Sequence, residues 1–406
     1  MHEFEVVILG NDINVYSVAR AFHTEYGIVS NAFGLSVGGI NVGSNIVNYK
    51  YVPNVDKTEA FLPTVNAFAK AHSDKKVFVL GCGDNYIEVI AENKGKYASN
   101  IITHCPSLED IRKLIRKEDF YNLCDEYGID RPKTLIHTSD IGYDFKLDFD
   151  SPFILKPSNS VMYWEFPFSG MKKVFKLNSR EELNETLKKV YEAGYTDKMI
   201  IQEFIPGNDT AMRVLTNYSN SNGKVKMMAL GHVLLEEHTP KGIGNHAVII
   251  TEPNTDVMNK YKDFLEKIGF VGFSNFDIKF DERDGKYKAF EINVRQGRSN
   301  YYVTAGGCNI AKCLVEEYIL KQDNEAKLVT DKILWLVVPK KVAFDYIPEY
   351  KEEMKALIKD KKCTNPLFYS KDKKIIRNLR LIKAYLAYFK KYKDYGNGRW
   401  EKNSVF

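Results

Sequence analysis

Apolar strands alternate with amphipathic helices through residues 1–105, and this alternation limits the fold more than any other feature of the sequence. Runs of strand length and segments with helical spacing follow one another in the order Glu5–Gly10, Val15–Tyr26, Tyr49–Pro53, Lys76–Gly81 and Asn85–Asn93. Strands and helices that alternate in this way form βαβ units around a parallel sheet. Residues 1–105 are therefore expected to be an N-terminal βαβ domain.

Two of these strands end in turn-forming residues, Gly10-Asn11-Asp12 and Gly81-Cys82-Gly83-Asp84. Ligands commonly bind outside the carboxyl ends of parallel strands. The glycines at positions 81 and 83 are only a weak sign of a nucleotide site, because the third glycine of a dinucleotide fingerprint and the Gly-Lys-Ser/Thr of a P-loop are missing. An ordinary turn explains them equally well. In the functional alternative, Asp84 and Tyr86 face a cleft.

The rest of the chain mixes helices with hairpins. We expect a helix over Ser107–Tyr127, and a hairpin around Ser221-Asn222-Gly223 that joins Met212–Thr216 to Val225–His232. Further strands are expected at Phe153–Pro157, Met199–Phe204, Phe273–Phe280 and Tyr287–Asn293, and further helices at Ser179–Tyr191 and Asp256–Ile268. The fold class is therefore α/β at the start of the chain and α+β after it.

The composition is that of an ordinary globular protein. The 406 residues are 44% hydrophobic and 27% charged, and a chain of this length usually folds as two or three units around a cleft. Six cysteines are scattered without a CxxC pair or zinc-ligand spacing. This pattern favours reduced thiols and a cytoplasmic location.

Basic charge is concentrated near the C-terminus. The net charge is +5, but Lys371–Lys402 alone contains eleven Lys or Arg residues and three acidic ones. The remainder is close to neutral, which argues against a general nucleic-acid-binding surface. Within this segment apolar residues recur at helical spacing at Ile375, Leu379, Ile382, Leu386 and Phe389. Such a basic amphipathic helix can either dock on the protein's own surface or lie on an anionic membrane.

Three side-chain oxygens on neighbouring strands form the most informative pattern. Glu291 and Asn293 are two residues apart on one expected strand, so they point to the same face. Asp277 can lie opposite them across the turn at Arg283-Asp284-Gly285. Carboxylate and amide oxygens suit Mg²⁺, whose coordination is completed by phosphate and water. The pattern therefore predicts a magnesium site, and a solvated sheet face is the alternative.

Lysines and an apolar strand accompany this set. Lys156 ends an apolar strand, where a surface role explains a lysine poorly, whereas Lys117 can be an ordinary exposed residue of its helix. The strand from Met199 breaks at Pro206-Gly207. Backbone groups at its edge are suited to hydrogen bonding with adenine, and Asp209 is suited to binding ribose hydroxyls. An ordinary buried strand with a turn explains the stretch equally well.

Taken in order, Lys156, the segment Gln202-Glu203-Phe204-Ile205-Pro206-Gly207, Asp277 and Glu291-Ile292-Asn293 resemble the ATP-grasp superfamily. The resemblance is closest to members that attach D-aspartate to the cell-wall precursors of Gram-positive bacteria. It is carried by ordered segments at Leu9–Tyr16, Cys82–Tyr86, Leu155–Ser160, Met227–His232 and Phe290–Ser299. It implies a pre-ATP-grasp domain at 1–105, ATP-grasp subdomains at 106–205 and 206–330, and a C-terminal extension with a basic amphipathic helix at 331–406.

The resemblance also implies roles for individual residues. ATP would be held by Lys117 and Lys156 at the phosphates and by Gln202, Glu203, Phe204, Ile205 and Asp209 at the adenosine. Mg²⁺ would be held by Asp277, Glu291 and Asn293. Arg295 and Arg298 would bind a substrate carboxylate or a developing acyl phosphate, as Arg does through charge-assisted bonds. Arg213 and His232 are weaker catalytic candidates, with a purely structural role as the alternative.

One departure from the superfamily concerns the loop at Ser158–Lys173. Many ATP-grasp enzymes cover the triphosphate with a glycine-rich loop, but this loop has only Gly170 and is rich in Phe, Tyr and Trp. Phosphate contacts from the loop are therefore not predicted. An aromatic lid that excludes water from an acyl phosphate is the alternative.

The implied function is an ATP-dependent carboxylate–amine ligase. The β-carboxylate of D-aspartate would be activated as an acyl phosphate and joined to the lysine ε-amino group of a peptidoglycan precursor. An ATP-grasp ligase for another amino acid or amine acceptor is the nearest alternative. A regulatory ATP-binding module is disfavoured by the complete metal set, and peripheral membrane contact rests on the C-terminal basic helix.

Overall fold

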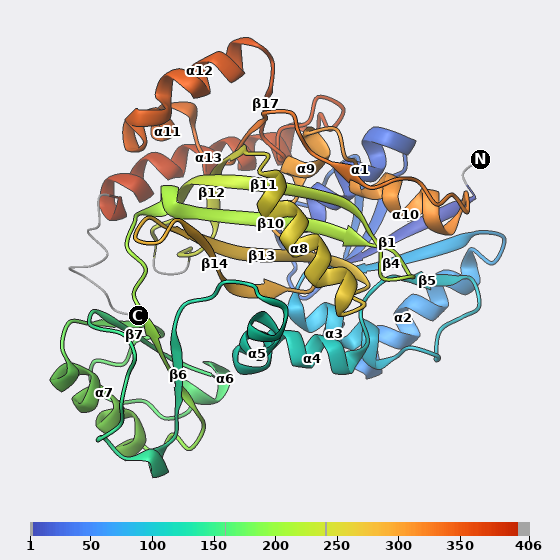
Figure 1. The fold of residues 1–406 in the computed structure, drawn as a ribbon. Helices are drawn as coiled ribbons and strands as arrows, with labels where there is room; N and C mark the ends of the chain where they lie inside the picture. The colour runs from blue at the N-terminus through green and yellow to red at the C-terminus, as the bar shows by residue number, and fades with distance from the viewer. Residues whose placement is uncertain (1–2, 159, 240–241, 397–406) are drawn as a thin grey trace.

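The computed structural model describes residues 3–158, 160–239 and 242–396 (Figure 1). Its strands form three sheets, each built from a separate part of the chain. The first lies at the right of Figure 1, the second forms a lobe at the lower left, and the third runs through the centre.

The N-terminal part is a parallel sheet with helices between its strands, as expected from the sequence. Its elements are β1 (Phe4–Leu9), α1 (Ile13–Tyr26), β2 (Ser30–Gly34), β3 (Val47–Tyr51), α2 (Thr58–Ala71), β4 (Lys76–Gly81), α3 (Asp84–Glu92) and β5 (Ile101–Thr103). The strand order is β3-β2-β1-β4-β5. The order reverses between β1 and β4, so a crevice opens at their carboxyl ends, the usual ligand position in such sheets.

The second sheet is antiparallel, in the order β6-β9-β7-β8. Its elements are β6 (Thr134–His137), η1 (Ser139–Ile141), β7 (Phe153–Pro157), α6 (Ser160–Tyr163), β8 (Phe175–Leu177), α7 (Arg180–Glu192) and β9 (Met199–Glu203). Tyr163, Phe166 and Phe168 of the aromatic loop pack into the core of this lobe. Trp164 is exposed. The three packed residues therefore stabilise the lobe. The expectation that they form an aromatic lid is wrong.

The third sheet has eight strands: β14-β13-β10-β11-β12-β16-β17, with β15 paired to β11. Its strands are β10 (Met212–Ser219), β11 (Val225–Glu236), β12 (His246–Thr251), β13 (Gly272–Asp281), β14 (Lys286–Asn293), β15 (Lys327–Leu328), β16 (Leu334–Leu336) and β17 (Cys363–Thr364). The turn η2 (Asp209–Ala211) and helices α8 (Thr255–Lys267), α9 (Tyr301–Ala305) and α10 (Ile310–Tyr318) accompany them. The expected hairpin at 221–223 is confirmed. Part of the expected extension at 331–406 belongs to this sheet, since β16 pairs with β12.

The single helix expected over Ser107–Tyr127 is wrong. The structure has α4 (Leu108–Ile115) and α5 (Lys117–Tyr127), separated by Arg116, whose backbone is extended with ψ 117°. Ser107 caps α4 as expected, by accepting a hydrogen bond from the backbone of Asp110. The break turns the chain so that α5 begins at Lys117, next to β14.

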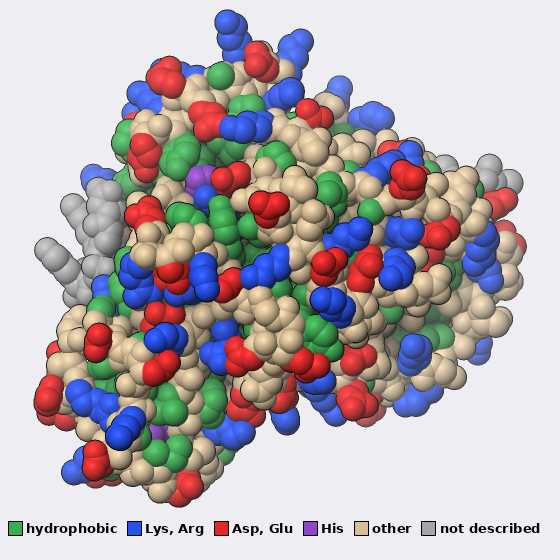
Figure 2. Space-filling model, viewed as in Figure 1, with side chains coloured by type: hydrophobic (Ala, Val, Ile, Leu, Met, Phe, Trp, Pro, Cys, Tyr) green, Lys and Arg blue, Asp and Glu red, His purple; other side chains and the backbone are tan. Residues whose placement is uncertain are grey.

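The C-terminal part contains α11 (Lys340–Tyr346), η3 (Pro348–Tyr350), α12 (Lys351–Lys359) and the long helix α13 (Ile375–Tyr395), at the upper left of Figure 1. Residues 397–402 of the basic segment lie outside the described residues. None of the helices described is both long and apolar enough to cross a membrane. On the face shown in Figure 2, Lys and Arg side chains are interspersed with Asp and Glu, as expected for a nearly neutral body.

Candidate active site

The three predicted metal ligands lie together on adjacent strands. In the register of β13 and β14, Asp277 pairs with Glu291 and Asn275 with Asn293, so all three ligand side chains share one face of the sheet. The Asn293 amide nitrogen donates to the Asp277 carboxylate at 3.2 Å. The shared face expected from the residue spacing is therefore present, while the metal role of these residues stays a prediction.

The charges of this set fit a divalent cation. Burial and the neighbouring Glu291 carboxylate raise the pKa of Asp277 well above its usual range, because two adjacent carboxylates cannot both ionise without a cation nearby. No cluster of three or more His, Cys, Asp or Glu side chains able to hold a metal occurs among the described residues. Two carboxylates and one amide oxygen still suit Mg²⁺, which often takes one or two carboxylates together with substrate phosphates.

Asp277, Glu291 and Asn293 form the predicted metal set, and two lysines approach it from different elements. Lys117, at the start of α5, places Nζ 2.8 Å from Oε2 of Glu291, and its charge lowers the pKa of Glu291 to about 2. Lys156, on β7, donates from Nζ to Oε1 of Gln202 at 3.1 Å. Burial, and then repulsion from Lys117, lowers the pKa of Lys156 to about 7. Phosphate groups would stabilise the charged form of both lysines.

Gln202 holds Lys156 in place. Its side chain is buried on β9, and Nε2 donates to the Tyr121 hydroxyl at 2.9 Å and to Oγ1 of Thr134 at 3.0 Å. Both amide hydrogens therefore have protein partners. The structure therefore places Gln202 beside Lys156, with its amide nitrogen bonded to Tyr121 and Thr134.

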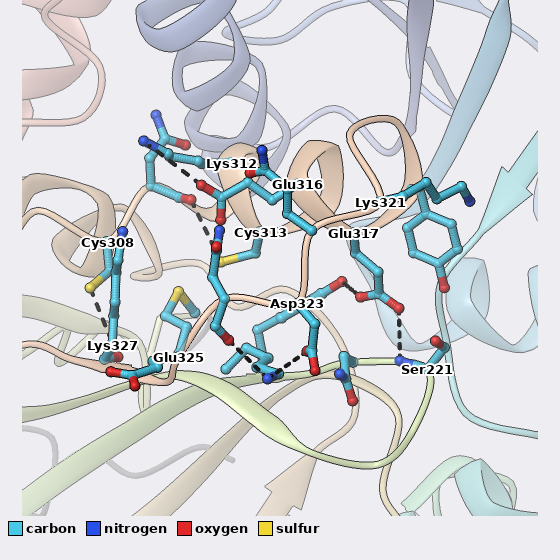
Figure 3. A pocket seen from close by; sticks show the side chains of 18 of the residues that line it. Ser221, Cys308, Lys312, Cys313, Glu316, Glu317, Lys321, Asp323, Glu325 and Lys327 are labelled. Atoms are coloured by element: carbon cyan, nitrogen blue, oxygen red, sulfur yellow. Dashed lines mark hydrogen bonds and ion pairs between the residues drawn. The ribbon is translucent and has the colours of Figure 1, made fainter.

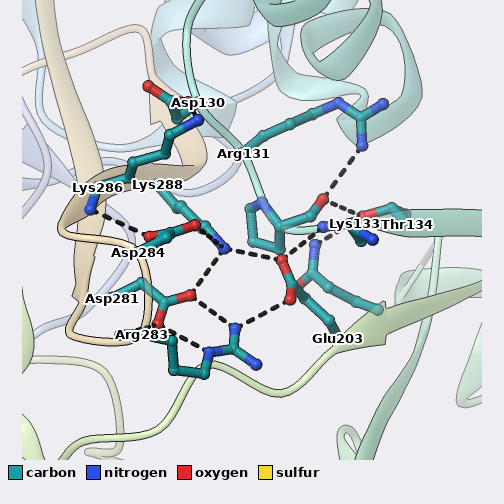
Figure 4. A network of polar contacts seen from close by, with 12 residues as sticks. Asp130, Arg131, Lys133, Thr134, Glu203, Asp281, Arg283, Asp284, Lys286 and Lys288 are labelled. Atoms are coloured by element: carbon teal, nitrogen blue, oxygen red, sulfur yellow. Dashed lines mark hydrogen bonds and ion pairs between the residues drawn. The ribbon is translucent and has the colours of Figure 1, made fainter. Parts of the chain in front are cut away.

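Glu203 joins two sheets through a network of ion pairs in which Glu203, Asp281 and Lys288 are buried (Figure 4). Its carboxylate accepts hydrogen bonds from the Lys133 backbone at 2.9 Å, from Arg283 at 2.9 Å and from Lys288 at 3.1 Å. Arg283 and Lys288 also bind Asp281, which is fully buried. Since Glu203 ends β9 and the others flank the turn between β13 and β14, the network fixes the second lobe against the third sheet.

The predicted adenosine residues follow Glu203 along the chain. Phe204 has Lys176 Nζ 4.1 Å from its ring centroid, and the Ile205 carbonyl accepts from Lys279 Nζ at 2.9 Å. Asp209 accepts from the Glu236 backbone at 2.8 Å and from Nε2 of His238 at 2.7 Å. Asp209 therefore lies at the end of β11.

Arg295 reaches from the metal set to the N-terminal domain. Its Nε donates to Oδ1 of Asp84 at 2.6 Å, and Nη2 donates to Oδ1 of Asn293 at 3.1 Å. Asp84 begins α3 at the carboxyl end of β4, so the crevice between β1 and β4 opens onto Arg295. Asp84 faces the site, as expected if the turn at Gly81–Asp84 has a functional role. Tyr86, which was expected to face it as well, is buried in a hydrophobic core.

Arg298 forms an ion pair with a residue outside the predicted metal set. Its Nη2 donates to Oε1 of Glu237 at 2.6 Å, and the Tyr388 hydroxyl from α13 donates to the same oxygen at 2.8 Å. These contacts raise the pKa of Arg298 despite its burial. Arg298 therefore connects the site to the C-terminal helix.

Arg213 and His232 are not brought together with the predicted metal ligands. Arg213 pairs across β10 and β13 with Ile278, whereas Val214 pairs with Asp277, so the Arg213 side chain points to the opposite face of the sheet. His232 pairs with Arg213. Both side chains contact Glu252, at 2.6 Å from Arg213 Nε and 3.5 Å from His232 Nδ1. Their placement matches the structural alternative.

Several polar residues near the site were not singled out from the sequence. Lys279 lies two residues after Asp277 on β13, and this spacing alone would have placed both on one face. Glu236 and His238 lie at and just beyond the end of β11, and burial, followed by the charge of Asp209, raises the pKa of Glu236 to about 7. Their closeness to Asp209 depends on tertiary contacts, so no sequence pattern indicated it.

A cavity of about 430 Å³ lies apart from all these residues, between α10 and the β10–β11 hairpin (Figure 3). Part of its charged lining is paired: Lys226 binds Asp323 at 2.7 Å, and the Ser221 backbone donates to Glu317 at 2.8 Å. Burial raises the pKa of the Cys308 and Cys313 thiols in its wall. We assign no role in the reaction to this cavity.

Comparison with known proteins identifies relatives. No protein-family model matches the chain. The chain is 40% identical over 409 residues to a D-aspartate ligase of Enterococcus faecium (strain Aus0004), and the match covers 97% of each protein.

Solved structures with the same fold share little sequence with the chain. N5-carboxyaminoimidazole synthetase from Staphylococcus aureus matches with a TM-score of 0.58 and 14% identity, over 86% of each chain. L-amino acid ligase from Bacillus licheniformis matches with a TM-score of 0.53 and 16% identity, over 78% of this chain and 74% of that one. The biotin carboxylase domain of the Hydrogenobacter thermophilus 2-oxoglutarate carboxylase, crystallised with MgADP and bicarbonate, has a TM-score of 0.58 and 14% identity, over 80% of this chain and 72% of that one.

These structures confirm the expected fold, a βαβ domain followed by an ATP-grasp pair of subdomains. The identity to the curated relative is high and extends over nearly the whole length of both proteins. The chain therefore belongs to the D-aspartate ligase family of ATP-grasp enzymes.

Proposed function

We propose that the chain joins the β-carboxylate of D-aspartate to the lysine ε-amino group of a peptidoglycan precursor, with conversion of ATP to ADP and phosphate. The family relationship supports an ATP-dependent carboxylate–amine ligase. The structural observation that carries the proposal is the convergence of Lys117 on Glu291, beside Asp277.

The chemistry requires activation of the acid. A carboxylate reacts poorly with an amine because its oxygen is a poor leaving group, and transfer of the γ-phosphoryl group of ATP supplies a good one. The amine then attacks the acyl carbon, and phosphate leaves. Catalysis of phosphoryl transfer consists mainly of positioning and charge stabilisation.

The site residues fit these tasks. Lys117 and Lys156 would balance the charge of the triphosphate, and Arg295 would bind a substrate carboxylate by charge-assisted hydrogen bonds. Asp277, Glu291 and Asn293 would hold Mg²⁺, which offsets charge on phosphoryl oxygens when it is bound. The Glu203 network would hold the lobe that carries Lys156 in a fixed position relative to the strands that carry Asp277 and Glu291.

The substrate pair is tested by mass spectrometry. Purified protein is incubated with ATP, Mg²⁺, D-aspartate and a lysine-containing peptidoglycan precursor, and we expect the precursor to gain one aspartyl residue as ADP accumulates. Turnover of L-aspartate without turnover of D-aspartate would contradict the assignment of D-aspartate as the acid substrate. ADP release across a panel of amino acids and amines would then identify the alternative ATP-grasp ligase.

A cytoplasmic location and a peripheral contact of α13 with a membrane are further parts of the proposal. All six cysteines are free, which fits a reducing compartment.

A further inference from the structure

Helix α13 carries a row of apolar side chains that faces away from the protein. Ile375 is 75% exposed, Leu379 61% and Leu386 54%, and Ile382 and Phe389 are exposed as well. At 3.6 residues per turn these positions fall on one side of the helix. Docking of this row on the protein's own surface, one of the two interpretations from the sequence, is therefore wrong.

The opposite side of α13 fixes the helix in this orientation. Arg377 is buried, lies 4.0 Å from the ring centroid of Tyr16 and pairs with Asp372 at 3.3 Å. At the other end the Tyr392 hydroxyl donates to the Glu236 carbonyl at 2.6 Å. Turning the apolar row inward would break these buried contacts, so its exposure is a property of the docked helix.

The charges around the row identify its partner. Lys383 and Lys390 flank the row along one side, at the angles given by helical geometry. Asp394 is the one acidic residue of α13. Asp372, which precedes the helix, is already paired with Arg377. A second copy of this chain docked face to face would bring like charges together. An anionic bilayer surface offers both an apolar layer for the row and phosphates for the lysines.

We propose that α13 lies on an anionic membrane, with the apolar row in the interfacial layer and Lys383 and Lys390 at the lipid phosphates. The proposal does not depend on the ligase reaction. It also places the membrane close to the candidate site, because Tyr388 of the same helix contacts the Glu237–Arg298 pair.

The test is flotation of the full-length protein with lipid vesicles. We expect binding to vesicles of phosphatidylcholine and phosphatidylglycerol in equal amounts, little binding to phosphatidylcholine alone, and loss of binding as salt is added. The variant Leu379→Ser/Ile382→Ser/Leu386→Ser should lose at least about tenfold in affinity, since each apolar side chain contributes to insertion. Its thermal unfolding should match wild type, because the three side chains are exposed.

Matched controls distinguish binding through α13 from nonspecific binding of other exposed apolar side chains to lipid. The variant Val37→Ser/Leu320→Ser removes exposed apolar side chains outside α13 and should bind as wild type. Lys383→Gln/Lys390→Gln should reduce the preference for anionic vesicles. Equal vesicle binding by wild type and the α13 triple variant, or no binding of wild type to either vesicle, would overturn the proposal. Self-association in solution that the triple variant abolishes would overturn it in favour of a second copy of the chain.

Discussion

Lys117 Nζ lies 2.8 Å from Oε2 of Glu291, so a residue expected to bind phosphate is paired with a residue expected to bind Mg²⁺. Each partner supplies the charge that the expected ligand of the other would bring: the Glu291 carboxylate takes the place of phosphate at Lys117, and the Lys117 ammonium takes the place of Mg²⁺ at Glu291. The pair crosses from α5 to β14, two elements far apart in the sequence, and it joins the cationic and anionic halves of the candidate site.

Loss of a metal ligand should abolish turnover while the fold is kept. Asp277→Asn and Glu291→Gln each remove one carboxylate from the predicted Mg²⁺ site, and we expect ADP release to fall by about a hundredfold or more, as for other groups that stabilise developing charge. Asp263→Asn, an exposed change on α8, is the matched control and should keep full activity. Wild-type rates in either ligand variant would remove these residues from the metal site.

The lowered pKa of Lys156 predicts that ATP binding depends on pH. With a pKa of about 7, this lysine loses its proton above neutrality, and bound phosphate favours the protonated form, so its pKa is higher in the complex than in the free protein. Binding then takes up a proton, and affinity should fall as pH rises above about 7, by at most tenfold per pH unit. Titration of a non-hydrolysable ATP analogue at several pH values measures this. Lys156→Arg stays charged and should flatten the profile, whereas identical profiles for the two proteins would contradict the role of Lys156.

The ion-pair network at Glu203 should contribute strongly to stability. Lys288→Met leaves the Glu203 and Asp281 carboxylates short of a buried partner, and we expect the free energy of unfolding in urea to fall by about 3 kcal/mol, as is typical when one partner of a buried pair is removed. Lys286→Met, whose exposed side chain pairs with Asp130, is the control and should change stability little. Equal stability of the two variants would show that the network is not a structural link.

Arg295 and Arg213 should behave differently when each is replaced by methionine. Arg295 contacts Asp84 and Asn293, and we expect Arg295→Met to lower kcat/KM for aspartate by about a hundredfold, the loss of a charge-assisted bond pair, with little change in stability. Arg213 contacts Glu252 on the opposite face of the sheet, so Arg213→Met should lower the midpoint of thermal unfolding and leave kcat/KM nearly unchanged. Steady-state kinetics and thermal melts of the two variants decide the assignment, and a large kinetic defect in Arg213→Met would reverse it.

The parts of the site that depend on local periodicity were predictable. The spacing of Glu291 and Asn293 predicted that these two residues share a face. Asp277 lies opposite Glu291 because a β-bulge shifts the register between the pairs Ile278–Ala289 and Asp277–Glu291, and the turn alone did not predict that shift. The facing of Arg213 was not predictable, because it depends on a register in which Val214, and not Arg213, lies opposite Asp277.

Other features required tertiary contacts. The break at Arg116 has no glycine or proline to mark it, yet it sets the position of Lys117. The bonds of Glu203 to Arg283 and Lys288 span about 80 residues of sequence, and local patterns carry no information at that range. The apolar row of α13 was visible from its spacing, but the structure was needed to show that it faces outward.

The most direct measurement of the central claim is a crystal structure of the protein with Mg²⁺ and a non-hydrolysable ATP analogue. We expect Mg²⁺ at about 2.1 Å from oxygens of Asp277, Glu291 and Asn293, with the analogue's phosphates on Lys117 and Lys156. A nucleotide bound elsewhere, or a metal coordinated without these three side chains, would contradict it.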